Sequence, residues 1–211
     1  MRVIGVRCAV VVLCMFSLAA AQSGEKEGHK SKPTSQAYIT RYYIEDPSPG
    51  STYETGPLHI FFSDGTHVVE DLPPKAKSTE NNIVLNQEGF SDVQLAEDRK
   101  TIGWAETYDN GGTSYAVALS VVICRSGKIV QSIHSGQMVW NWMFVDRGKR
   151  VAIVWGPTHG PEVGDFRLYD VRTGKILAEV YGDEETQALK PDAPQWAKKL
   201  EERLNGVAKE K

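Results

Sequence analysis

The sequence predicts an all-β protein of antiparallel four-stranded units, followed by one α-helix near the C-terminus. Three observations lead to this fold class. From Tyr38 onward, short runs of β-branched and aromatic residues alternate with clusters of turn residues, a pattern typical of antiparallel strands. Two stretches forty-seven residues apart have nearly the same sequence, which indicates an internal repeat. After Gly182 the apolar residues recur at four-residue steps, which is the spacing of a helix face.

The strands are expected to follow one another with turn residues such as Asp64-Gly65 and Ser126-Gly127 between them. The longest connection, residues 71–89, contains two successive prolines and is expected to be an exposed loop. In YAVALSVVIC (115–124) and VAIVW (151–155), apolar residues fill both alternating positions, which predicts sheets covered on both faces. The expected strands are residues 37–44, 57–63, 66–70, 90–96, 100–107, 114–124, 128–133, 138–145, 149–156, 164–171 and 175–180.

The C-terminal segment is expected to form one amphipathic helix over about residues 193–205. Asp192 precedes Ala193-Pro194 and is expected to cap the helix, with the proline in the first turn and Gly206 as the stop. One face of the helix carries Trp196, Leu200 and Leu204. This face is expected to cover an otherwise exposed sheet.

The repeat is most evident in ICRSGKIV (123–130) and DVRTGKIL (170–177). A phosphate-binding loop would need a helix after the Gly-Lys pair, whereas Ile129 and Ile176 follow the two lysines in strand-like surroundings. A tight hairpin turn built twice explains the glycines better. The similarity extends to LAEDRKTIGW (95–104) and FVDRGKRVAI (144–153), at an offset of forty-nine residues. Each block therefore reads as four strands joined by turns, the composition of one propeller blade.

At these motifs the chain resembles the WD40 repeat family and exported β-propeller proteins. FRLYDVRTGKILAEV (166–180) resembles the last two strands of a WD40 repeat, with Tyr169-Asp170 where the family has Trp-Asp. FVDRGKRVA (144–152) resembles the Phe-x-x-x-Gly-Lys-x-Leu-Ala stretch of the family. The resemblance is best over residues 134–180 and implies propeller-like blades and a non-catalytic binding role.

The chain has material for about two and a half to three blades, whereas complete propellers have about four to eight. It therefore cannot close a ring alone. Three arrangements remain open: a partial propeller capped at its ends, a ring completed by a second copy, and a two-sheet sandwich made from the same hairpins. Residues 37–182 are expected to form this β domain, with 183–211 as a helical tail.

The N-terminus is expected to be a cleaved export signal over residues 1–21, followed by a disordered arm over residues 22–36. Arg2 and Arg7 precede an apolar run that ends in three alanines. Cleavage removes two arginines and no acidic residue, so the formal net charge changes from −3 to −5. This charge argues against nucleic-acid binding. We expect a periplasmic or secreted protein that has no membrane span after cleavage and keeps Cys124 alone, as a buried inert thiol.

Few residues suggest chemistry. His159 and Glu162 lie with Asp165 in the loop WGPTHGPEVGD (155–165), which is able to bind a metal ion or transfer protons if its side chains converge. An exposed loop histidine is the plainer interpretation, and Asp109 lies in a turn-like loop. Trp140 and Trp142 are two residues apart and are therefore expected on one face of a strand. With Trp155, they are expected to form either a ligand platform or part of the core.

The function predicted from these observations is an exported, non-catalytic binding or scaffold module. Its expected partner is a protein or another envelope component, with association of two copies as a possibility and without a cofactor, metal or catalytic residues. The alternative is a secreted hydrolase or metal-dependent enzyme that uses His159, Glu162 and Asp165.

Overall fold

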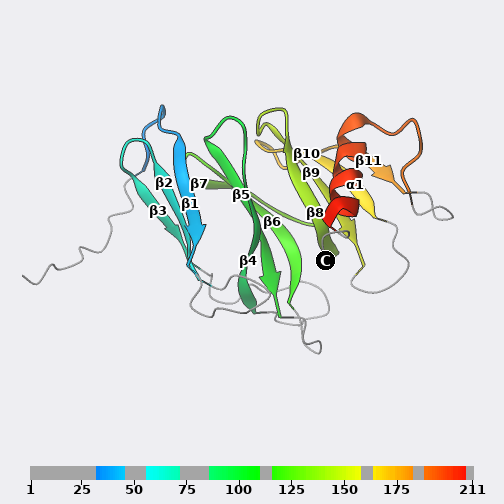
Figure 1. The fold of residues 1–211 in the computed structure, drawn as a ribbon, viewed down its shortest axis with the longest axis horizontal. Helices are drawn as coiled ribbons and strands as arrows, with labels where there is room; N and C mark the ends of the chain where they lie inside the picture. Colours follow the sequence, from blue (N-terminus) through cyan, green and yellow to red (C-terminus); the bar gives the residue numbers. More distant parts are fainter. Residues whose placement is uncertain are drawn as a thin grey trace, which may run out of the picture.

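The computed structural model describes residues 32–45, 56–71, 86–109, 116–157, 164–182 and 188–207. Within these residues, eleven strands form three antiparallel sheets, and one helix follows near the C-terminus (Figure 1). All eleven expected strands are present, and the all-β class with a C-terminal helix is confirmed. The boundaries differ by up to three residues, at the starts of the fourth and sixth strands.

Each sheet takes its strands in chain order, so neighbours in sequence are neighbours in the sheet. The first sheet has three strands and the other two have four. The first sheet contains β1 (Ile39–Ile44), β2 (Leu58–Phe62) and β3 (His67–Glu70). The second contains β4 (Gln87–Leu95), β5 (Thr101–Tyr108), β6 (Val117–Arg125) and β7 (Lys128–His134). The third contains β8 (Met138–Val145), β9 (Arg150–Gly156), β10 (Asp165–Asp170) and β11 (Ile176–Tyr181).

The two Gly-Lys segments both connect the third and fourth strands of a four-stranded sheet, but the turns differ in length. Ser126 and Gly127 form a two-residue turn with φ values of 48° and 70°, which suits a tight hairpin. In the third sheet the turn is longer, and the backbone N–H of Asp170 donates to the carbonyl of Lys175. The Asp170 carboxylate accepts hydrogen bonds from the Thr173 backbone and hydroxyl at 2.7 and 2.8 Å, and these bonds lower its pKa.

The strand pairs β1–β2, β5–β6 and β9–β10 align at their ends, although a β-bulge between Ile39 and Arg41 interrupts the first of them. In each of these strand pairs, the residue that follows the second strand donates its backbone N–H to the carbonyl of the residue that precedes the first strand. The equivalent Cα pairs are Ile39 with Phe62, Thr101 with Arg125, and Arg150 with Asp170. The equivalent bonds run from Ser63 to Tyr38, Ser126 to Lys100 and Val171 to Lys149, at 2.9, 2.9 and 3.0 Å. Strands β1, β2 and β3 therefore correspond to β5, β6 and β7 and to β9, β10 and β11.

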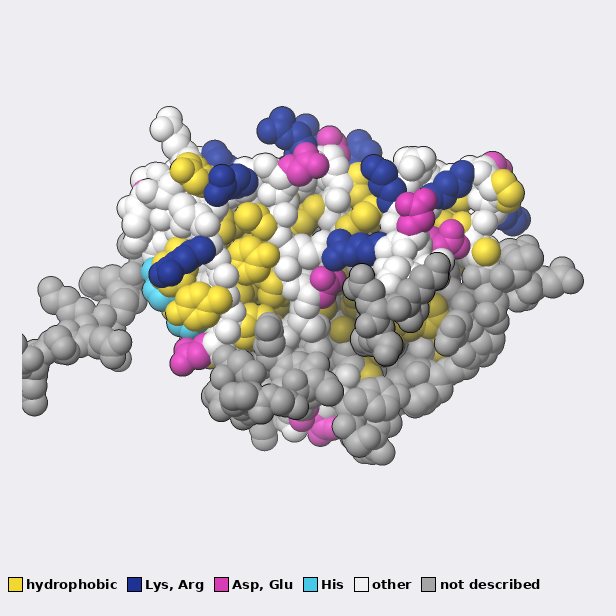
Figure 2. All heavy atoms as spheres, viewed as in Figure 1, with side chains coloured by type: hydrophobic (Ala, Val, Ile, Leu, Met, Phe, Trp, Pro, Cys, Tyr) yellow, Lys and Arg dark blue, Asp and Glu magenta, His cyan; other side chains and the backbone are white. Residues whose placement is uncertain are grey.

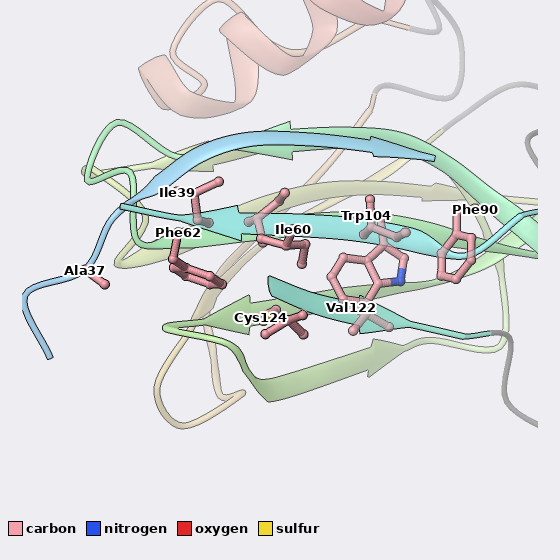
Figure 3. Packing of buried hydrophobic residues seen from close by; sticks show 11 residues of the cluster. Ala37, Ile39, Ile60, Phe62, Phe90, Trp104, Val122 and Cys124 are labelled. Carbon is pink, nitrogen blue, oxygen red and sulfur yellow. The ribbon is translucent and has the colours of Figure 1, made fainter. Parts of the chain in front are cut away.

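Three apolar clusters hold the sheets and the helix together in a row. The first cluster joins the first and second sheets, where Figure 3 shows Ile60 and Phe62 together with Trp104 and Cys124. The second cluster joins the second and third sheets, and the third cluster joins the third sheet to the helix. The second sheet is thus covered on both faces, as the apolar runs of its strands predict.

The helix α1 (Gln195–Val207) covers the outer face of the third sheet, at the opposite end of the molecule from β1–β3 (Figure 1). Leu200 is fully buried there, and Trp196 and Leu204 are half-buried, which confirms the expected covering face. Ala197 is equally buried, although the sequence analysis did not single it out.

The expected ends of α1 were wrong. The carbonyl of Pro194 accepts the first helical hydrogen bonds, from Ala197 at 3.0 Å and Lys198 at 3.2 Å. The helix therefore begins at Gln195, directly after Pro194, and Asp192 does not cap it. Proline is tolerated at this position because the first N–H groups of a helix have no partner within the helix. Gly206 lies within the helix rather than beyond its end.

Residues 32–36, which were expected in the arm, lie against the turns at one end of the sheets. Pro33 is buried beside Gly127, and the backbone N–H of Thr34 donates to the Asp64 carboxylate at 2.7 Å. Together with a hydrogen bond from the Thr66 backbone, this contact lowers the pKa of Asp64 to about 2. The chain is therefore fixed before it enters β1.

A truncation in α1 tests whether the helix contributes to the core. Leu200→Ala is expected to lower the free energy of unfolding by about 2–5 kcal/mol, because it removes a fully buried side chain and leaves a cavity. Lys199→Ala, on the exposed side of the same turn, is the matched control and is expected to change it by less than about 0.5 kcal/mol. Urea unfolding of both variants gives the comparison, and equal midpoints would contradict the role of α1.

Candidate functional site

Of the three loop residues singled out for chemistry, the structure describes Asp165 alone. His159 and Glu162 lie outside the described residues. Asp165 begins β10 and pairs with Arg167, whose Nη2 lies 3.3 Å from the carboxylate. Asp109 follows β5, and its backbone N–H donates to the carbonyl of Asn86 at 2.9 Å. Among the described residues, no group of three or more His, Cys, Asp or Glu side chains is arranged to hold a metal ion.

The tryptophans do not form a platform on one face. A β-bulge between Val139 and Asn141 interrupts the alternation of β8, so the expectation that Trp140 and Trp142 share a face was wrong. Trp142 lies fully buried in the cluster between the second and third sheets, whereas Trp140 packs half-buried in the cluster beneath α1. There its ring lies so close to Gly156 that a Cβ at that position would meet ring atoms at 2.1 Å.

Trp155 belongs to the core. Its side chain is fully buried between the second and third sheets, and its indole Nε1–H donates to the hydroxyl of Tyr169 at 3.0 Å. Burial raises the pKa of Tyr169, which keeps the phenol neutral in this environment. Of the two interpretations, core packing holds for Trp142 and Trp155.

Replacement of Trp155 tests this internal hydrogen bond. Trp155→Phe is expected to lower the free energy of unfolding by about 1–3 kcal/mol, since the buried donor is lost together with part of the packing. The same change in a Tyr169→Phe background is expected to cost less, because the hydroxyl acceptor is already absent. Chemical unfolding of the four proteins in this double-mutant cycle measures the difference, and strict additivity would exclude coupling through the hydrogen bond.

Cys124 and Ser120, two reactive side chains of the second sheet, are enclosed. Cys124 is fully buried, and burial together with the nearby charge of Glu70 raises the pKa of its thiol to about 12, which confirms the inert thiol. The Glu106 carboxylate accepts hydrogen bonds from the Tyr108 hydroxyl at 2.9 Å and from the hydroxyl of Ser120. Ser120 has no exposed surface, so it offers no nucleophile to a substrate.

The feature that best fits a site is the outer face of the first sheet, which carries Arg41, Tyr43, His59, Phe61 and His67. We refer to these five residues as the aromatic–histidine face. They alternate along β1, β2 and β3 with the residues that face the second sheet. Figure 2 shows histidine side chains over the first sheet, next to hydrophobic and Lys or Arg side chains.

The rings of the aromatic–histidine face are stacked on one another. The centroids of Tyr43 and His59 lie 4.6 Å apart, and those of Phe61 and His67 lie 4.1 Å apart with an interplanar angle of 6°. The guanidinium carbon of Arg41 lies 4.0 Å from the centroid of the Phe61 ring. Such contacts hold aromatic and cationic groups in fixed positions on an exposed surface.

A chain of polar contacts connects the two histidines. His59 Nδ1 lies 3.0 Å from His67 Nε2, and His59 Nε2 lies 3.2 Å from the Glu45 carboxylate. The partners are on opposite nitrogens of His59, so the three side chains form a line rather than converge on one point. The arrangement can hold one proton between the rings. Desolvation, and then the neighbouring His59 and Arg41, lower the pKa of His67.

The common register identifies which residues occupy the same positions in the other sheets. The pairs Arg41–Phe61 and Tyr43–His59 of the first sheet correspond to Ile102–Cys124 and Trp104–Val122 of the second. All four residues of the second sheet are buried in the first apolar cluster. Positions that a preceding sheet covers in the second sheet are therefore open to solvent in the first sheet, and all of them except Phe61 carry side chains with polar groups.

Sequence reasoning missed this face because β1 and β2 looked like ordinary strands. A signal was present in LHIFFSDGTHVV (58–69), where the turn at Asp64-Gly65 folds the two histidine-containing strands together. The hairpin register pairs Phe61 with His67. The exposure of the face could not be read from the sequence, since it depends on which sheet lacks a neighbour.

No protein-family model, curated protein sequence or solved structure matches this chain. In the described part of the chain, no helix is both long and apolar enough to cross a membrane.

The histidine pair is expected to make stability depend on pH. Because the pKa of His67 is lowered, the unfolded chain binds a proton more tightly at this residue than the folded protein does. As the pH falls through about 6.5, protonation therefore favours unfolding. Between pH 7 and pH 5 the melting temperature of the wild type is expected to fall more than that of His67→Gln. Thermal unfolding at both pH values tests this, and parallel decreases would contradict it.

Proposed function

We propose that this protein is an exported, non-catalytic binding module with a propeller-like arrangement of its sheets. The observation that carries the proposal is the aromatic–histidine face, which is open to solvent at positions that are covered in the second sheet. Tyr43, which belongs to this face, is 46% exposed, although its ring stacks on that of His59. An exposed aromatic surface of this kind is typical of a binding site.

Two features support the propeller-like arrangement. The four-stranded sheets are meanders in chain order, and the sheets pack face to face through continuous apolar clusters. Tyr169, at the position of the WD40 Trp-Asp pair, lies in the cluster against the preceding sheet and accepts the hydrogen bond from Trp155. We therefore interpret the first, second and third sheets as one incomplete and two complete blades of a partial propeller.

The two ends of the row differ in a way that favours binding at the first sheet. At the far end α1 packs Ala197 and Leu200 against the third sheet, so the chain covers that surface itself. At the near end the exposed rings are already held by mutual stacking and by Arg41. A face that is ordered before binding loses little conformational entropy when a partner covers it.

The expected partner is a protein or another component of the cell envelope. This class follows from the export signal expected over residues 1–21 and from the chemistry of the face. Tyr and Arg side chains provide large contact area with polar groups at the tips, which suits protein surfaces.

Site-specific photocrosslinking in the cells that make the protein tests this function. A benzoyl-phenylalanine at position 43 is expected to crosslink to a defined partner, while the same group at position 199 on α1 serves as the control on the covered end. Once the partner is purified, Tyr43→Ala is expected to weaken its binding by about tenfold or more. The absence of a crosslink specific to position 43 would refute the proposed function.

A further inference from the structure

We propose that the free edge of β1 accepts an extended polypeptide segment as a fourth, antiparallel strand of the first sheet. The inference rests on the proposed binding function and specifies its partner. That partner is a chain segment in β conformation with apolar or aromatic side chains at alternate positions.

The common register shows which strand the first sheet lacks. In the second and third sheets, β4 pairs with the edge of β5 and β8 pairs with the edge of β9. Strand β1 corresponds to β5 and β9, but in the described residues it pairs with β2 alone. Among the described residues, the first sheet therefore ends where the other two sheets continue by one strand.

The backbone of β1 presents hydrogen-bonding groups along this edge from Tyr42 onward, whereas the N–H and C=O of Ile39 bond to Arg99. The N–H of Glu45 donates to the carbonyl of Pro57 at 3.0 Å, on the side of β2. On each strand of an antiparallel pair, every second residue forms backbone hydrogen bonds to the partner strand. Tyr43 and Arg41, two and four residues before Glu45, therefore also bond to β2. Tyr42 and Ile44 therefore direct their N–H and C=O groups toward the free edge.

The side chains of β1 leave this edge accessible. Residues 40–43 are all exposed, and the rings of Tyr42 and Tyr43 keep 37% and 46% of their surface open. Charged side chains commonly protect edge strands from further pairing. The one charged residue of β1, Arg41, instead lies over the ring of Phe61 in the aromatic–histidine face.

The counterparts β4 and β8 indicate the chemistry of the missing strand. Leu95 in the second sheet and Phe144 in the third each pair with the residue that corresponds to Arg41. In the third sheet, Trp142 pairs with the residue that corresponds to Tyr43. An added strand with such side chains would extend the aromatic–histidine face across β1. A second copy of β1 would place Arg41 and Glu45 there, so an apolar segment matches the position better.

Amide exchange with a defined peptide tests the proposal. The probe has the sequence of residues 86–96 of this protein, which contain β4, and is added to the chain from Gln22 onward. At about 1 mM peptide, the amide exchange of Tyr42 and Ile44 is expected to slow by about twofold or more, the protection given by a Kd of about 1 mM. Unchanged exchange at both amides would overturn the proposal.

Two matched controls separate strand pairing from general stickiness. Tyr42→Ala and Tyr42→Pro both remove the ring, but only proline also removes the outward N–H, at an edge position that tolerates proline. The alanine variant is expected to keep the protection of Ile44, and the proline variant to lose it. A peptide N-methylated at the amides that would face β1 gives the same comparison with the protein unaltered. Equal protection by both peptides would refute strand addition.

The outcome is distinguishable from failure of the proposed function. If a partner crosslinks at position 43 equally well in Tyr42→Pro, the binding module stands and strand addition is wrong. If no partner crosslinks at position 43, the proposed function itself fails. If light scattering shows a dimer that Tyr42→Pro dissociates, a second copy occupies the edge and the proposal for a separate segment is overturned.

Discussion

The structure depends on one constraint. A sheet that has apolar residues on both faces needs another layer packed against each face. The second sheet meets this condition through its two neighbouring sheets, and the third meets it through one sheet and α1. Each cluster takes side chains from two successive layers, so no layer has a complete core of its own. The row of sheets therefore behaves as one cooperative unit, and its ends are the places where the sequence must change.

The first sheet illustrates that change. Its inner face has the same character as the others, with Leu58 and Ile60 fully buried against the second sheet. Its outer face has His59 and Arg41 at positions that are aliphatic in the second sheet. The His59 ring contacts His67, and the Arg41 guanidinium lies over the ring of Phe61. Since large aromatic rings stay on this surface, the face is neither an ordinary polar exterior nor a core. This intermediate character is the feature on which the proposed binding role rests.

Local pattern was sufficient to predict the strands, the order of the hairpins and the apolar side of α1, because each depends on residues close in sequence. It was insufficient at Trp140, where a bulge adds one residue to β8 and places Trp140 and Trp142 on opposite faces without a composition signal. It was also insufficient for the start of α1, where Pro194 provides the capping carbonyl. The aromatic–histidine face escaped prediction because exposure is set by how many sheets are present. The loop with His159 lies outside the described residues, so the prediction for that loop stays a prediction.

The cover that α1 places on the third sheet also limits how copies of the protein can associate. Growth into a filament requires two different surfaces that fit each other, one at each end of the molecule. In the part of the chain that the structure describes, the helix covers one end with its own apolar side chains, including Leu200, and the other end of the row is the first sheet. Self-association through that end would stop at a closed pair.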